Sequence, residues 1–330
     1  MALTEEGLVH VAGLLSRFVR LGTGVKAHYV TSGETGPAVV LLHGGFIGSS
    51  GTAGWRYMAP FLGSHGFRVY CPDMPAFGLT EDPEGVYAYG EAGHVDFLHD
   101  FVDALCLDRF HLGGNSMGCT NSAYFVVSHP ERVLSFALVA GGVGDVAPGG
   151  PDTRPAAERP AIPTFDGTPE AMRKALEAIV YRSEDIDDDL VAMRTEAANR
   201  HRPAYERFRE SWLAALRGEG DPNAAARLRT KGRLDAITIP GIYLHGRQDV
   251  LSPAETAYAK EDGLPNIQFF YPDETGHQGQ TDRPELFNQV FLELFRDGRV
   301  SADTAVRAGL SSRRPPLPSV VDVPGLPKER

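Results

Sequence analysis

The sequence has few cysteines, and their spacing is not that of metal ligands. Cys71, Cys106 and Cys119 are an odd number of widely separated thiols. This pattern excludes a disulfide framework and favours buried, reduced thiols in a cytoplasmic protein. We therefore expect a cytoplasmic location and no bound metal.

Long apolar runs and an excess of positive charge are also missing. No stretch reaches the ~20 consecutive apolar residues of a membrane-spanning helix, and the acidic N-terminus lacks the basic-then-apolar order of a signal peptide. Lysine and arginine number 32 against 43 aspartates and glutamates, for a formal net charge of -11. This balance argues against nucleic acid or an anionic membrane as a partner.

What is present is an ordinary globular composition with alternating strand and helix patterns. The 330 residues suffice for one large domain with an insertion or for two domains. Residues 16–21 and 25–32 predict an antiparallel hairpin. The expected strands that follow are residues 38–42, 67–71, 109–112 and 135–140, and the expected helices are residues 55–63, 89–105 and 117–128. This alternation predicts a mostly parallel α/β sheet.

The pattern changes at Asp145. Helical spacing predicts helices over residues 169–181, 187–199 and 203–216, with no convincing strand before Ile237. We interpret residues 145–232 as a helical cap inserted into a core made of residues 1–144 and 233–300. Strands over residues 241–245 and 267–271 and helices over 253–262 and 283–296 complete that core. Residues 301–330 form a Pro-rich tail, either disordered or laid over a surface, with little to bury.

The stretch Gly114-Asn115-Ser116-Met117-Gly118 stands where a strand is expected to turn into a helix. A Gly-x-Ser-x-Gly pattern at such a turn holds the serine on a sharp, strained bend with its hydroxyl exposed. The same pattern also fits a plain glycine-rich turn, since glycine and serine are common. The rest of the chain has to decide between the two.

An acid and a base follow the serine in the order that this architecture uses. Asp249 comes after one late strand and His277 after the last. A serine hydroxyl is a poor nucleophile until a neutral imidazole accepts its proton, and a carboxylate orients that imidazole. The alternatives are a helix-capping role for Asp249 and an ordinary loop histidine. The chain order of these three residues, each after a predicted strand, predicts Ser116, His277 and Asp249 as catalytic residues.

A glycine-rich loop follows the strand that ends at Leu42. It lacks the Gly-Lys-Ser/Thr ending of a phosphate-binding loop, which leaves an oxyanion loop or a flexible turn. An oxyanion hole needs two donors aimed at one point. We expect the backbone N–H of Met117 as one donor and that of Gly45 or Phe46 as the other.

Together, the strand before His43-Gly44-Gly45, Pro72-Asp73, the Ser116 pentapeptide, Gly246-Arg247-Gln248-Asp249 and Gly276-His277 resemble the α/β-hydrolase superfamily over residues 16–298. The pentapeptide looks most like that of the meta-cleavage product hydrolases, serine enzymes that split carbon–carbon bonds of ring-opened aromatic compounds. The resemblance implies that Asn115 and Gly44 contact substrate and that Arg194 binds the substrate carboxylate. Gln278 stands where the family usually has Trp, and Phe46-Ile47 where it has Gly and Pro, at positions that contact substrate.

The sequence therefore predicts a cofactor-independent serine hydrolase of the α/β-hydrolase fold. The expected partner is a small-molecule substrate with a carbon–carbon bond beside a ketone. An ester or lactone would use the same residues, and a non-catalytic ligand-binding protein on this fold, such as a hormone receptor, is a further alternative. A homo-oligomer such as a dimer stays open. Ser116 in place of an aspartate disfavours an epoxide hydrolase or a dehalogenase.

Overall fold

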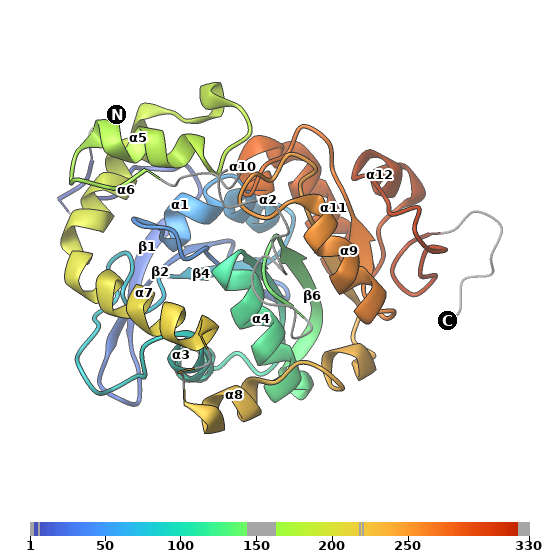
Figure 1. The fold of residues 1–330 in the computed structure, drawn as a ribbon, viewed down its shortest axis with the longest axis horizontal. Coiled ribbons are helices and arrows are strands. Elements are labelled where there is room, and N and C mark those ends of the chain that lie inside the picture. Colours follow the sequence, from blue (N-terminus) through green and yellow to red (C-terminus); the bar gives the residue numbers. More distant parts are fainter. Residues whose placement is uncertain (1–2, 6, 144–162, 218, 220, 323–330) are drawn as a thin grey trace.

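An eight-stranded sheet runs through the computed structural model, which describes residues 3–5, 7–143, 163–217, 219 and 221–322 (Figure 1). Its strand order is β1-β2-β4-β3-β5-β6-β7-β8. The strands are β1 (Leu15–Arg20), β2 (Lys26–Ser32), β3 (Ala38–Leu42), β4 (Arg68–Pro72), β5 (Phe110–Asn115), β6 (Val133–Val139), β7 (Gly241–Leu244) and β8 (Gln268–Phe270). Only β1, β2 and β4 pair antiparallel; the other neighbours are parallel. The predicted mostly parallel α/β sheet is confirmed.

Helices cover both faces of the sheet, which is why the central strands are apolar throughout. Along β3, Val40 and Leu42 face one apolar cluster and Val39 and Leu41 the other, and all four are fully buried. This alternation is the period of two that a strand imposes. The first face carries α3 (Glu91–Ala104), α4 (Met117–Ser128) and α9 (Ala254–Gly263); the second carries α1 (Gly51–Trp55), α2 (Met58–Ser64) and α11 (Pro284–Asp297).

The residues between β6 and β7 hold helices and, in the part that the structure describes, no strand. The helices are α5 (Pro169–Glu177), α6 (Asp188–Arg200), α7 (Arg202–Leu216) and α8 (Pro222–Leu228). Side-chain oxygens of Thr168 and Asp187 accept backbone N–H groups at the starts of α5 and α6, the usual helix-capping arrangement. Figure 1 shows α5, α6 and α7 as an arch along one side of the core. The predicted start of this insertion, at residue 145, lies outside the described residues.

The helix predicted over residues 55–63 is two helices, α1 and α2, separated by Arg56 and Tyr57. Pro60 explains the difference, because proline has no N–H to donate to the preceding turn and clashes with it inside a helix. In the structure Pro60 stands in the first turn of α2, where N–H groups have no helical acceptor in any case.

The segment from residue 301 to 322 packs on the core, so the expectation that it has little to bury was wrong. It contains a further helix, α12 (Ala302–Arg307), and its buried apolar side chains are Ala305, Ala308, Val320 and Val321. Leu310 pairs with Phe270 at the free edge of β8, and Val321 pairs with Val300. An exposed sheet edge offers unpaired backbone groups that a passing segment can satisfy. Residues 323–330 lie outside the described part.

Candidate active site

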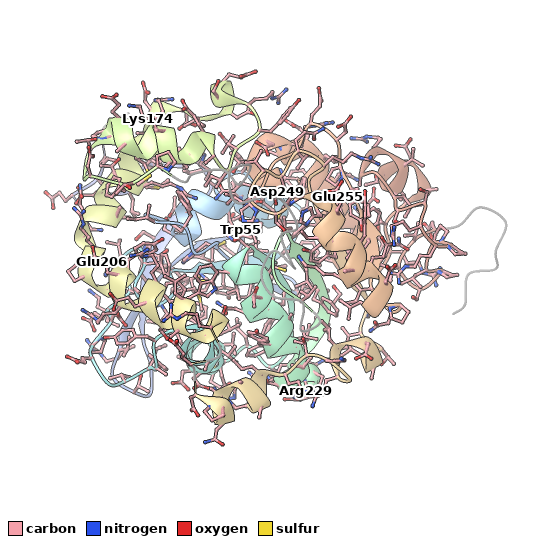
Figure 2. All side chains as sticks on the ribbon, viewed as in Figure 1. Trp55, Lys174, Glu206, Arg229, Asp249 and Glu255 are labelled. Carbon is pink, nitrogen blue, oxygen red and sulfur yellow. The ribbon has the colours of Figure 1, made fainter. Side chains whose placement is uncertain are left out.

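Ser116, Asp249 and His277 each follow a different strand of the sheet. Ser116 comes directly after β5, Asp249 after β7 and His277 after β8. Because parallel strands end at the same edge of a sheet, these residues meet there, where α/β proteins form their ligand sites. Asp249 lies near the middle of the molecule, whereas Lys174 of α5 lies at its rim (Figure 2).

Ser116 occupies a strained turn between β5 and α4. Its φ of 56° is in the left-handed region, and its N–H donates to the carbonyl of Val139 at 2.7 Å. The flanking glycines have no room for a side chain. A Cβ on Gly114 would lie 2.1 Å from the Gly118 oxygen, and one on Gly118 would lie 2.2 Å from the Leu42 oxygen. Strain of this kind survives only where packing enforces it, and it is common at functional sites.

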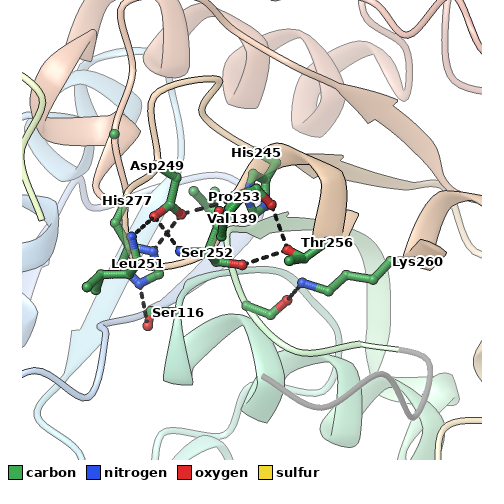
Figure 3. Close-up of polar contacts among 12 residues, drawn as sticks. Ser116, Val139, His245, Asp249, Leu251, Ser252, Pro253, Thr256, Lys260 and His277 are labelled. Carbon is green, nitrogen blue, oxygen red and sulfur yellow. Dashed lines mark hydrogen bonds and ion pairs between the residues drawn. The ribbon is translucent and has the colours of Figure 1, made fainter. Parts of the chain in front are cut away.

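The three side chains form a continuous hydrogen-bonded chain (Figure 3). His277 Nε2 lies 2.8 Å from Ser116 Oγ, and His277 Nδ1 lies 2.7 Å from Asp249 Oδ2. The other carboxylate oxygen, Oδ1, accepts the backbone N–H groups of Leu251 and Ser252. A carboxylate on Nδ1 fixes the tautomer that leaves Nε2 free to accept a hydroxyl proton. The arrangement can therefore activate the serine hydroxyl.

Asp249 stays ionised in this buried position. Burial by itself raises the pKa of Asp249, but the charge and hydrogen bond of His277, with the Ser252 N–H, outweigh it and lower the pKa below its ordinary value. The negative charge is then available to stabilise a protonated imidazole.

The glycine-rich loop lies directly against the Ser116 turn. A Cβ on Gly44 would lie 3.3 Å from Ser116 Cβ, and one on Gly45 would lie 2.9 Å from Met117 Sδ. The residues predicted as oxyanion donors, Gly45, Phe46 and Met117, all line the same cavity as Ser116. His43 fixes the start of the loop: its Nδ1 bonds the Gly44 carbonyl and its Nε2 accepts the N–H of Met74.

A cavity of about 760 Å³ opens over Ser116 and His277. Its walls are largely apolar, and the larger apolar side chains that line it are Phe46, Ile47, Phe165, Phe208, Trp212, Leu213 and Leu251. Apolar walls with a few polar groups are typical of small-molecule sites. Charged side chains that the sequence analysis did not assign to the site also line it: Glu91, Arg202, Glu206 and Arg209. Their only sequence signal was charge on a helix, which also fits a solvated face.

Two of the predicted substrate-binding residues, Gly44 and Gln278, lie on the cavity wall, and two do not. Asn115 is buried beneath it and donates from Nδ2 to the carbonyl of His277 at 2.9 Å. The side chain thus ties the Ser116 turn to the loop of His277.

Arg194, the fourth, is 1% exposed on α6. Its Nε and Nη1 have no hydrogen-bond acceptor. Burial and the nearby charge of Arg56 lower the pKa of Arg194 to about 9. A buried guanidinium without a carboxylate partner is costly.

Asp282, which the sequence analysis missed, secures the loop of His277. In helix α10 (Gly279–Asp282), its Oδ2 accepts the N–H of Gly276 at 2.7 Å and its Oδ1 the N–H of Tyr181 at 2.8 Å. Tyr181 belongs to the insertion, so one carboxylate joins the His277 loop to it. Burial raises the pKa of Asp282 to about 6. The sequence gives no signal for this role, because both donors are backbone groups.

Among the described residues, no cluster of three or more histidine, cysteine or acidic side chains could hold a metal ion. Within the same residues, none of the helices has both the length and the apolar character needed to cross a bilayer.

Comparison with known proteins places these features in a family. The family model described as alpha/beta hydrolase fold matches residues 37–284. A 2-hydroxy-6-oxo-6-(2'-aminophenyl)hexa-2,4-dienoic acid hydrolase from Metapseudomonas resinovorans is 30% identical over 288 residues, 85% of this chain and 90% of that protein. A 2-hydroxy-6-oxononadienedioate/2-hydroxy-6-oxononatrienedioate hydrolase from Paraburkholderia phymatum is 28% identical over 299 residues, 88% of this chain and 98% of that protein.

A solved structure agrees with these relatives. The 2-hydroxy-6-oxo-6-phenylhexa-2,4-dienoate hydrolase from Rhodococcus sp. strain RHA1 superposes with a TM-score of 0.70 at 27% identity. The match covers 86% of this chain and 99% of that one. The likeness therefore extends over most of both chains.

Proposed function

The chain belongs to the alpha/beta hydrolase fold family, and we propose that it is a cofactor-independent serine hydrolase that cleaves a carbon–carbon bond beside a ketone in a ring-opened aromatic catabolite. The relatives that it resembles are named as hydrolases of 2-hydroxy-6-oxo-dienoic acids. In this proposal residues 145–232 form a cap that closes over Ser116 and keeps bulk water out. The cytoplasmic location and the dimer stay predictions.

The Ser116–His277–Asp249 chain would supply the nucleophile and the proton transfers. His277 Nε2 takes the proton of Ser116 as Oγ attacks the ketone carbon. The carbonyl oxygen becomes an alkoxide, which the N–H groups of Met117 and of Gly45 or Phe46 would stabilise. The carbon–carbon bond then breaks, and the departing carbon takes the electron pair and the proton that His277 had accepted. Water, activated by His277, hydrolyses the acyl-enzyme and restores Ser116.

The proposal that the substrate is an acid rests on one observation: the buried guanidinium of Arg194 has no carboxylate partner. Gly48, which follows the cavity residue Ile47, packs on the Arg194 backbone, and Tyr205 of the cavity wall lies within reach of its charge. We infer that a substrate carboxylate at this side of the cavity binds Arg194. Arginine suits the role because its planar fork binds a carboxylate through two hydrogen bonds.

A substrate panel tests the proposal. We expect the highest kcat/KM for a 2-hydroxy-6-oxo-dienoic acid, with two carboxylic acids as products, and lower values for p-nitrophenyl esters and lactones. A preference for neutral esters would instead support an esterase. A Ser116 that never reacts with a fluorophosphonate would support a non-catalytic binding protein.

A further inference from the structure

The turn that follows β6 is a second strained segment at the site. Ala140 has a φ of 51°, and Ala140, Gly141 and Gly142 all line the cavity. This turn packs on the Ser116 turn through the backbone. A Cβ on Gly141 would lie 2.4 Å from the Ser116 oxygen and 2.5 Å from Cys119 Cβ. Two strained turns therefore support each other, and a shift of one would displace the other.

Two buried side chains donate hydrogen bonds to the Gly141 carbonyl. Tyr243 donates its hydroxyl to the Gly141 oxygen at 2.8 Å, and Lys260 Nζ donates to the same oxygen at 3.0 Å. Lys260 extends toward the site from α9 (Figure 3). Its Nζ also bonds the Tyr243 hydroxyl at 3.2 Å. Both side chains are at most 1% exposed. None of the ion pairs in the described part of the chain includes Lys260.

The same network continues to the loop of Asp249. The Tyr243 hydroxyl lies 3.3 Å from His245 Nδ1, and His245 Nε2 lies 2.7 Å from the Ser252 carbonyl. The Ser252 N–H donates to Asp249 Oδ1. Lys260 and Tyr243 are thus connected to both the Ser116 turn and the acid loop.

Resting on the proposed role of Ser116 as nucleophile, we propose that Lys260 and Tyr243 are positioning residues that hold the Gly141 carbonyl and so keep Ser116 in its reactive conformation. A buried lysine is costly, which disfavours a purely packing role that an apolar side chain would fill better. A backbone carbonyl that receives two donors is fixed in direction as well as in place, as preorganisation of a site requires.

The charge on Lys260 strengthens this contact. The titratable groups that face it are Cys119 of α4, Tyr243 of β7, and His245 and Asp249 of the loop after β7. Burial lowers the pKa of Lys260 to about 8, although Cys119 and Asp249 act to raise it. The amine is therefore charged at pH 7, and a charged donor forms a stronger hydrogen bond than a neutral one.

The test measures the second-order rate at which a fluorophosphonate labels Ser116, because this reaction needs no natural substrate. Lys260→Met and Tyr243→Phe remove one donor each, and we expect labelling at least tenfold slower than in the wild type. Tyr271→Phe is the matched control: Tyr271 is also buried at a strand end, but its hydroxyl bonds Glu261 instead of Gly141. We expect that variant to label within twofold of the wild type.

A pH series separates positioning from a general loss of stability. The ratio of wild-type to Lys260→Met labelling rates should fall between pH 7 and pH 9.5, as the wild-type amine loses its charge. Equal rates for folded Lys260→Met, Tyr243→Phe and wild type would overturn the inference. If Lys260→Met does not fold, Tyr243→Phe at the wild-type rate would still overturn it. A wild type that does not label at all would overturn the proposed function itself.

Discussion

Arg194 and Arg56 are buried arginines whose like charges repel each other, and only Arg56 has a carboxylate partner. Arg56 Nη2 bonds Asp187 at 2.8 Å, whereas no ion pair in the described residues includes Arg194. A second positive charge beside an unpaired one makes the uncompensated charge more costly. An anionic ligand would relieve both effects, which is why we assign the substrate carboxylate to Arg194.

Arg194→Met should weaken turnover of acidic substrates selectively. Loss of a desolvated charged pair should lower kcat/KM for a 2-hydroxy-6-oxo-dienoic acid. The loss of transition-state stabilisation should be roughly 2–4 kcal/mol. The same variant should hydrolyse a small neutral ester nearly as well as the wild type, since Ser116 and His277 are unchanged. Steady-state kinetics with both substrates measure the difference.

Arg207→Met provides the control for that experiment. Arg207 lies on the neighbouring helix α7, is exposed and bonds the hydroxyl of Tyr89. The Arg207→Met substitution should leave kcat/KM unchanged for both the acid and the ester. Equal losses on acid and ester in Arg194→Met would show that Arg194 supports the fold and does not bind carboxylate.

Asp282→Ala should lower kcat with little change in KM. The carboxylate fixes the backbone on which His277 sits, through Gly276, and ties it to Tyr181 of the insertion. We expect about a tenfold loss of kcat, or ~1.4 kcal/mol of transition-state stabilisation. Asp303→Ala, at an exposed aspartate of α12, is the control. An unchanged kcat in a folded Asp282→Ala protein would count against this role.

Lys260 should make the stability of the protein depend on pH in the alkaline range. The ordinary lysine pKa of 10.5 applies to the unfolded chain, and the folded pKa is about 8. Between these values the unfolded state binds more protons, so stability rises with pH. The free energy of unfolding should rise by about 3 kcal/mol relative to that of Lys260→Met, since each unit of pKa difference corresponds to ~1.4 kcal/mol. Urea unfolding of both proteins at pH 7, 9 and 10.5 measures it; a difference that does not vary with pH would refute it.

Val321→Ala should destabilise the protein, although it lies far along the C-terminal segment. Val321 is 2% exposed, whereas Val306 of α12 is 72% exposed. Removing two buried methyl groups costs roughly 1–2 kcal/mol. Val306→Ala should change the free energy of unfolding by less than about 0.5 kcal/mol. Equal effects in the two variants would mean that the segment does not pack as described.

The strands and the Ser116 turn could be predicted because their signals are local. The apolar run of β3, the glycines around Ser116 and the chain order of Asp249 and His277 are read directly along the sequence. The boundary between α1 and α2 is not predicted although Pro60 is visible, because the helical spacing of apolar residues continues past it. The C-terminal segment was missed for a different reason: it is held by backbone bonds to the edge of β8, which residue types do not reveal.

The environment of the site residues depends on tertiary contacts and cannot be predicted from the sequence. Helical spacing placed Arg194 on a helix but could not show that its guanidinium is buried without an acceptor. The same limit applies to Lys260, whose position on α9 fits a solvated face as well as a buried one. The Asp282 carboxylate accepts only backbone N–H groups, those of Gly276 and Tyr181, so no pattern of side chains marks it.

Incubation of a 2-hydroxy-6-oxo-dienoic acid with wild type and with Ser116→Ala, followed by quantification of the products, tests most directly whether Ser116 cleaves a carbon–carbon bond. The wild type should consume the dienoate chromophore and release two carboxylic acids in equal amounts. The Ser116→Ala protein should be folded and slower by several orders of magnitude. A wild type that leaves this acid intact, or a Ser116→Ala variant that retains a tenth of wild-type activity, would contradict the claim.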